Sequence, residues 1–89
     1  MAEITVSIRN KTGLHMRPAE QIAQTASKFR SEILISKDDL TVNGKSIMGV
    51  MMLAAEYGSA ITIQATGEDE ADAIATLAQL VEDRFGEPE

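Results

Sequence analysis

A change of hydrophobic period near residue 15 places the strongest constraint on how this chain can fold. From Glu3 to Arg9, apolar and polar residues alternate, with Ile4, Val6 and Ile8 on one face, as in a half-buried strand. From Met16 onward the apolar residues recur at the spacing of an amphipathic helix, and they are Ala19, Ile22, Ala23, Ala26 and Phe29. A strand and a helix therefore follow each other within a few residues, so the fold must combine both.

The same two periods predict the remaining elements. Strands are expected at Glu32–Ser36, Leu40–Val42 and Ala60–Thr66, the first two joined as a hairpin. A short helix is expected from Ile47 to about Ala55. A long helix should begin after Gly67 and run to about Phe85, with an apolar stripe of Ala71, Ile74, Leu77, Ala78 and Val81. The resulting order, β-α-β-β-α-β-α, indicates an α+β protein with one mostly antiparallel sheet, covered by helices on one face. A ferredoxin-like binding domain remains the alternative at this stage.

Composition removes several classes of function. The 89 residues are expected to form a single domain, residues 1–89, with a net charge of −6, which argues against general nucleic-acid binding. Cysteine is absent and histidine occurs once, so no metal or cofactor is expected. No segment approaches the roughly 20 apolar residues of a membrane span. We expect a cytoplasmic protein without membrane insertion, and a monomer, because no strong dimer signal is present.

The single histidine lies in the segment Gly13-Leu14-His15-Met16-Arg17-Pro18-Ala19, just before the first predicted helix. Pro18 fits the first turn of a helix, where its missing N–H has no partner in any case. Unpaired N–H groups and the helix dipole favour an anion there, and they disfavour the imidazolium form of His15. The segment thus predicts a nucleophilic His15 that accepts a phosphoryl group, with Arg17 stabilising its oxygens. The alternative is a solvated histidine beside a surface arginine.

Two further features follow Asn43-Gly44. Ser46 is well placed as the N-cap of the short helix, and a phosphate on it would be tolerated beside the positive end of the dipole. On the residues alone, a plain cap is the favoured interpretation. The next segment, residues 47–55, is apolar almost all round and contains Ile47, Met48 and Met51. It is either a deeply buried helix or an adaptable surface for a protein partner.

Together these motifs resemble the HPr family, the histidine-containing phosphocarriers of the phosphoenolpyruvate-dependent sugar phosphotransferase system. Gly13-Leu14-His15-x-Arg17-Pro18-Ala19 is similar to the family's phosphohistidine motif, and residues 43–51 are similar to its regulatory-serine segment. The resemblance covers nearly the whole chain. It implies an open-faced β-sandwich: a four-stranded antiparallel sheet with three helices on one face.

The resemblance also implies roles and partners. His15 would take a phosphoryl group at Nδ1 from phospho-enzyme I and pass it to an enzyme IIA domain, with support from Arg17. Ser46 would be modified by HPr kinase/phosphorylase, with a catabolite-control regulator as a further partner. The apolar surface around Ile47, Met48 and Met51 would dock enzyme I and the acceptors. Met16 departs from the family pattern, which usually has a smaller residue there.

Two other functions compete with a phosphocarrier. One is a regulatory module whose main output is Ser46 phosphorylation, although the relatives with that bias can lack the histidine that is present here. The other is a generic α+β ligand-binding domain. The chain has no GxxxxGK[ST] loop and no carboxylate pair arranged for acid–base work, so this domain ranks last.

Overall fold

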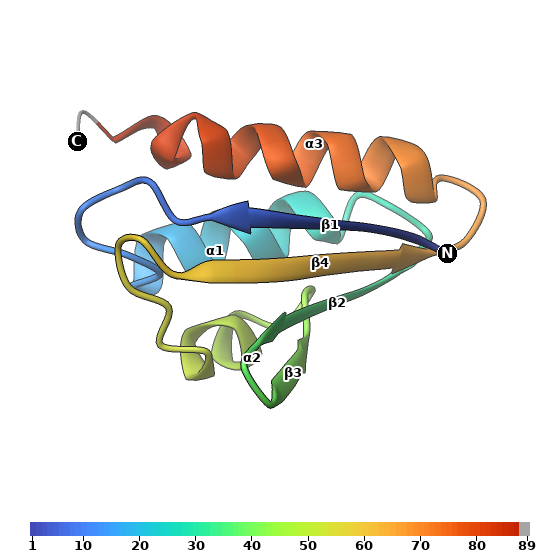
Figure 1. Cartoon of the computed structure of the whole chain (residues 1–89). Helices are drawn as coiled ribbons and strands as arrows, with labels where there is room; N and C mark the ends of the chain where they lie inside the picture. The colour runs from blue at the N-terminus through green and yellow to red at the C-terminus, as the bar shows by residue number, and fades with distance from the viewer. Residues whose placement is uncertain (88–89) are drawn as a thin grey trace.

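The computed structural model describes residues 1–87 of the chain. Its elements are β1 (Ala2–Ser7), α1 (Met16–Ala26), β2 (Glu32–Lys37), β3 (Leu40–Asn43), α2 (Ile47–Met52), β4 (Ala60–Thr66), α3 (Glu70–Glu82) and a 3-10 turn, η1 (Arg84–Gly86) (Figure 1). The predicted order of strands and helices is confirmed. The final 3-10 turn was not predicted.

The four strands form one antiparallel sheet with the spatial order β1-β4-β2-β3. Strand β4 lies between β1 and β2, so that Ile63 faces Ile4 on one side and Ile35 on the other. Strands β2 and β3 form the predicted hairpin, closed by the pair Lys37 and Leu40. The row of isoleucines packs across the strands and holds their register.

Helices cover one face of this sheet and leave the other open. In Figure 1, α1 lies behind the sheet and α3 runs alongside β1. The inward-facing residues of β2 and β4 are buried: Ile33, Ile35, Ile61, Ile63 and Ala65. On the opposite face Thr5 is exposed, and its hydroxyl hydrogen-bonds to that of Thr62 at 2.9 Å. This alternation confirms the predicted sheet with a single covered face.

Several element ends differ from the prediction because the backbone turns earlier. Strand β1 ends at Ser7 and not at Arg9. Helix α2 ends at Met52 and not near Ala55, since Ala54 has a φ of +49° and cannot continue a right-handed helix. Helix α1 ends at Ala26, so that Phe29 packs from the loop beyond it.

The C-terminal helix required two corrections. Helix α3 ends at Glu82, because the chain turns through positive φ values at Arg84 (+56°) and Phe85 (+57°). Its buried stripe is Ala73, Leu77 and Val81, whereas Ala71, which was predicted to be inside, is exposed. The apolar residues of this helix fit two overlapping stripes, and only packing against the sheet selects one of them. Within residues 1–87, no helix is long and apolar enough to cross a membrane.

Candidate functional site

His15 is the N-cap of α1, with an extended backbone conformation (φ −78°, ψ −172°). The loop that precedes it is anchored to the segment that follows α2. Gly13 has a φ of +71°, and the N–H of buried Leu14 donates to the carbonyl of Ala55 at 2.9 Å. The His15 carbonyl then accepts the N–H of Ala19 at 3.0 Å, which is the first hydrogen bond of the helix. The backbone at His15 is therefore fixed on both sides.

The first turn of α1 offers donors to an anion. The opening N–H groups of any helix lack intrahelical partners, and in α1 these groups belong to Met16 and Arg17, because Pro18 has no N–H. The predicted position of Pro18 in the first turn is confirmed. Helix α1 has no acidic residue in this turn that could offset the positive end of its dipole.

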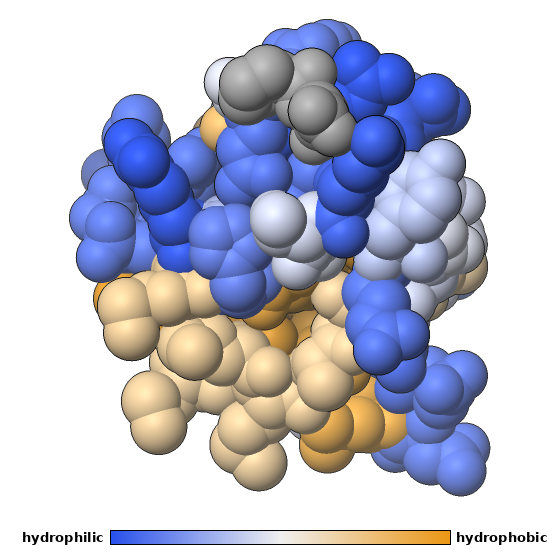
Figure 2. Space-filling model, turned by 90° about the vertical axis from the view of Figure 1, so that its left-hand side faces the viewer, coloured by the Kyte–Doolittle hydropathy of each residue, from blue (hydrophilic) through white to orange (hydrophobic). Residues whose placement is uncertain are grey.

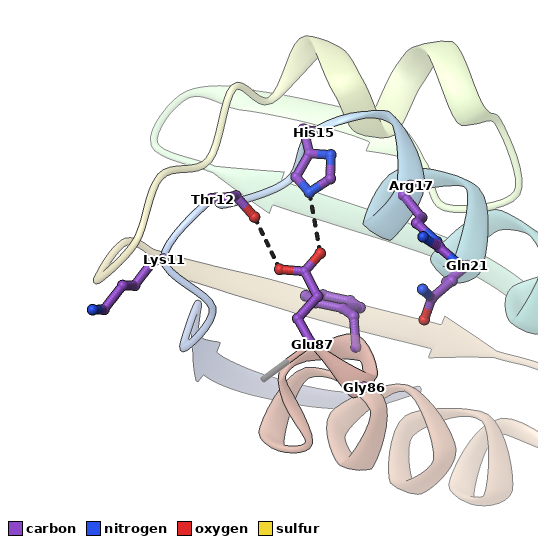
Figure 3. Close-up of a pocket in the computed structure, with 8 residues that line it drawn as sticks. Lys11, Thr12, His15, Arg17, Gln21, Gly86 and Glu87 are labelled. Atoms are coloured by element: carbon purple, nitrogen blue, oxygen red, sulfur yellow. Dashed lines mark hydrogen bonds and ion pairs between the residues drawn. The ribbon is translucent and has the colours of Figure 1, made fainter. Parts of the chain in front are cut away.

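The His15 imidazole is partly exposed, and one of its two nitrogens is already engaged (Figure 3). Its Nε2 lies 3.1 Å from Oε2 of Glu87, which comes from the chain just after η1. An ionised carboxylate only accepts hydrogen bonds, so this contact places a proton on Nε2. The other ring nitrogen points away from Glu87 in Figure 3. In the neutral tautomer with its proton on Nε2, this second nitrogen carries the lone pair.

Glu87 is itself held by two residues of the loop before His15. Its Oε1 accepts hydrogen bonds from the Thr12 hydroxyl at 2.9 Å and from the Asn10 amide nitrogen at 3.2 Å. The same Asn10 nitrogen donates to the Gly13 carbonyl at 2.8 Å, and its side chain is fully buried. Although burial alone raises the pKa of the Glu87 carboxyl, the hydrogen bonds from Thr12, His15 and Asn10 outweigh burial and lower it.

Arg17 and His15 line the same open pocket, which has a volume of about 560 Å³. The remaining lining residues are Lys11, Thr12, Gln21, Phe85, Gly86 and Glu87. Figure 3 shows Arg17 and Gln21 one turn apart on α1, on the side of the pocket across from the loop that carries Lys11. Two cationic side chains, a helix start and an imidazole therefore meet here, an arrangement suited to an anionic electrophile. Among residues 1–87, no cluster of side chains is suited to hold a metal ion.

Ser46 lies apart from that pocket. It is the N-cap of α2, and its hydroxyl oxygen accepts the N–H of Gly49 at 3.0 Å, which confirms the predicted cap. The neighbouring Lys45 reaches back to the carbonyl of Phe29 at 2.8 Å and so ties this turn to the loop that follows α1. The structure thus brings His15 and Arg17 together and leaves Ser46 at a second location.

The α2 segment is less buried than a core helix would be. Val50 is fully buried, but Met48 is 72% exposed and Ile47 is 37% exposed, while Met51 is half-buried against the core. Other large apolar residues are also exposed here, namely Met16, Met52 and Tyr57. Figure 2 shows apolar side chains gathered at the lower left and lower centre of the view, with polar side chains above them and at the lower right. These exposed or half-buried side chains make up the apolar surface of the protein: Met16, Ile47, Met48, Met51, Met52 and Tyr57.

Sequence reasoning missed Asn10 and Glu87. A signal existed for Asn10, because it continues the inward positions of Ile4, Val6 and Ile8 and is therefore a polar residue at a buried place. Glu87 carried no such signal. It lies 72 residues from His15 in the sequence, and only the turn through Arg84 and Phe85 brings it close.

Comparison with known proteins gives a consistent result. The family model described as the PTS HPr component phosphorylation site matches residues 2–83. The phosphocarrier protein HPr of Neisseria meningitidis is 48% identical over 89 residues, covering all of both chains. The HPr-like protein Crh of Bacillus subtilis is 45% identical over 83 residues, covering 93% of this chain and 98% of the relative.

A solved structure of HPr from Thermoanaerobacter tengcongensis has a TM-score of 0.96 at 50% identity, with full coverage of both chains. Its likeness confirms the open-faced β-sandwich and excludes the ferredoxin-like alternative. The generic ligand-binding domain is excluded by the family match. This chain belongs to the HPr family of the phosphotransferase system, whose members are phosphocarrier proteins and not enzymes.

Proposed function

We propose that His15 accepts a phosphoryl group from phospho-enzyme I and passes it to an enzyme IIA domain. The observation that carries this proposal is the position of His15 at the start of α1, in an open pocket that it shares with Arg17. The lone-pair nitrogen attacks phosphorus while the bond to the donor breaks, and the helix start and Arg17 stabilise the phosphoryl oxygens. Family membership supports the same assignment.

Arg17 is proposed to stabilise the group during transfer. A guanidinium can donate two parallel hydrogen bonds to phosphate oxygens, which an ammonium cannot do. Loss of one such donor typically slows a reaction by about 10² to 10³. We expect Arg17→Ala to slow phosphorylation by about that factor and Arg17→Lys to restore only part of the rate.

The test is incubation with enzyme I, phosphoenolpyruvate and Mg²⁺, followed by intact mass and ³¹P NMR. One acid-labile phosphoryl group is expected on the wild-type chain and none on His15→Ala. A control carrier must be labelled in parallel to show that enzyme I is active. Labelling of the His15→Ala variant at the wild-type level would refute the assignment of His15 as the phosphoryl acceptor.

The apolar surface is proposed as the docking site for both partners, with Ile47, Met48 and Met51 in contact. Methionine side chains adapt to surfaces of different shape, which suits a carrier that must bind a donor and then an acceptor. Met48→Lys should weaken both encounters. Ala71→Lys is the control, because Ala71 is an exposed apolar residue on α3, and Figure 1 shows α3 far from α2.

Ser46 is proposed as a regulatory site for an HPr kinase/phosphorylase, and the modified form as a ligand for a catabolite-control regulator. Ser46 directly precedes Ile47 of the apolar surface. A phosphate there adds nearly two negative charges that must be desolvated on docking, so it should reduce transfer to His15. Incubation with the kinase and ATP should label the wild-type chain but not Ser46→Ala. Absence of label on the wild type would count against this role.

The carrier is further proposed to act as a cytoplasmic monomer. Sedimentation of the purified chain at micromolar concentration tests its oligomeric state, and a dimer under those conditions would refute that part.

A further inference from the structure

The carboxylate of Glu87 is the only negative group among the described residues that line the His15 pocket. It contacts Nε2 at 3.1 Å, while Thr12 and Asn10 hold its other oxygen at 2.9 and 3.2 Å. A side chain fixed by three hydrogen bonds is not a chance surface neighbour of the imidazole. Because the rest of the pocket is suited to an anion, a negative side chain held in this position is expected to act on the imidazole that it contacts.

From this geometry we infer that Glu87 is a positioning residue, which keeps the proton of His15 on Nε2 so that Nδ1 presents its lone pair to phosphorus. The inference rests on the proposed function and deepens it. A neutral imidazole has two tautomers, and only the one with a proton on Nε2 donates to the carboxylate. Glu87 thus selects the nitrogen that reacts.

The same carboxylate stabilises the phosphorylated ring. When the lone pair of Nδ1 forms the N–P bond and the donor leaves with its electron pair, the ring keeps its proton on Nε2 and becomes positively charged. That charge lies against Glu87, and Figure 3 shows Glu87 between Lys11 on one side of the pocket and Arg17 on the other. When the group is passed on, the electron pair of the N–P bond returns to Nδ1 and the ring is neutral again. No proton has to move at Nε2 in either step.

Two substitutions separate these roles. Glu87→Ala removes both the acceptor and the charge, whereas Glu87→Gln keeps an oxygen that can accept from Nε2 but removes the charge. Glu32→Ala is the matched control, since Glu32 is an exposed acid that pairs with Thr66 at the opposite end of the sheet. Both positions lie outside the core, so the three variants should keep the fold.

The first measurement is the tautomer ratio of His15, from the ¹⁵N shifts of the ring at the alkaline plateau of its own titration curve. One hydrogen bond between partly exposed groups should shift this ratio by roughly three- to fivefold in Glu87→Ala. Glu87→Gln should stay close to the wild type, and Glu32→Ala should match it. Equal ratios in Glu87→Ala and the wild type would overturn the inference, as would an equal shift in Glu32→Ala.

The second measurement uses phosphoramidate, a small phosphoryl donor that needs no partner protein. The ratio of Nδ1 to Nε2 products, read by ³¹P NMR, should fall in Glu87→Ala by a similar factor and be restored in Glu87→Gln. An unchanged ratio in Glu87→Ala would contradict selection of the nitrogen by Glu87. If phosphoramidate gives the Glu87-dependent pattern but enzyme I does not label His15, the inference stands while the proposed function fails.

Discussion

The most informative single substitution in the site loop is Gly13→Ala, compared with Gly58→Ala. Both glycines have a positive φ, +71° and +87°. A Cβ built on Gly58 meets nothing within 4 Å, whereas one on Gly13 lies 2.6 Å from the carbonyl oxygen of Ala55 and 3.1 Å from Cα of Glu56. The pair therefore separates the cost of the left-handed backbone from that of the close approach.

The magnitudes follow from these contacts. An alanine in the left-handed region costs about 1–2 kcal/mol relative to glycine, and this is the whole expected effect at Gly58. At Gly13 the new Cβ must also push away the Ala55 carbonyl, which accepts the N–H of Leu14 at 2.9 Å. Loss of that hydrogen bond adds about 1 kcal/mol. Gly13→Ala should thus cost about 2–3 kcal/mol, still below the roughly 5–15 kcal/mol that stabilises a typical domain.

Urea unfolding followed by circular dichroism measures both values, with equal slopes expected for a two-state domain. Phosphorylation by enzyme I should be slower in Gly13→Ala, because the displaced loop carries His15, and unchanged in Gly58→Ala. Equal destabilisation of the two variants would refute the reasoning, since it would show that the contact with Ala55 does not constrain the loop.

Three further predictions concern stability, and unfolding in urea checks each of them. Asp69 accepts hydrogen bonds from the Ser31 hydroxyl and from the N–H groups of Arg30 and Ser31, which lower its pKa from 3.8 to about 2. Because the pKa of Asp69 is lower in the folded state, this stabilisation is present above about pH 4 and is lost as the pH falls toward 2. The free energy of unfolding of Asp69→Asn should therefore decrease less than that of the wild type between about pH 4 and pH 2. Ser46→Ala should cost about 1 kcal/mol through loss of the N-cap bond to Gly49, and an unchanged midpoint would contradict the cap. Ala71→Leu should leave the free energy of unfolding nearly unchanged because Ala71 is exposed, whereas Ala73→Leu should cost about 1–3 kcal/mol by overpacking the core. A larger loss of stability in Ala71→Leu than in Ala73→Leu would show that Ala71 is the buried residue, as the sequence had predicted.

Those elements whose packing follows from a local pattern could be predicted from the sequence. The alternation around Ile4 and Ile63 and the helical spacing from Ala19 to Ala26 specify both the type of element and its inner face. The ends of the elements were less predictable, because Ala54 and Phe85 have positive φ values although neither residue type favours them. The choice between Ala71 and Ala73 depended on the position of the sheet, which the sequence of one helix does not contain.

The functional site, too, could be predicted from the sequence only in part. His15, Arg17 and the cap at Ser46 belong to short segments whose local chemistry implies their positions, and the structure agrees on where they lie. The contact between His15 and Glu87 depends on the turn at η1, where the buried Phe85 side chain fixes the chain direction despite a φ of +57°. A backbone held in that region stores strain that burial of the phenyl ring must offset. Phe85 is buried in the core and Glu87 contacts the His15 imidazole, so the contact depends on packing near the C-terminal end of the described chain as well as on the motif around His15. If Glu87 selects the nitrogen as inferred above, that selection depends on the same packing.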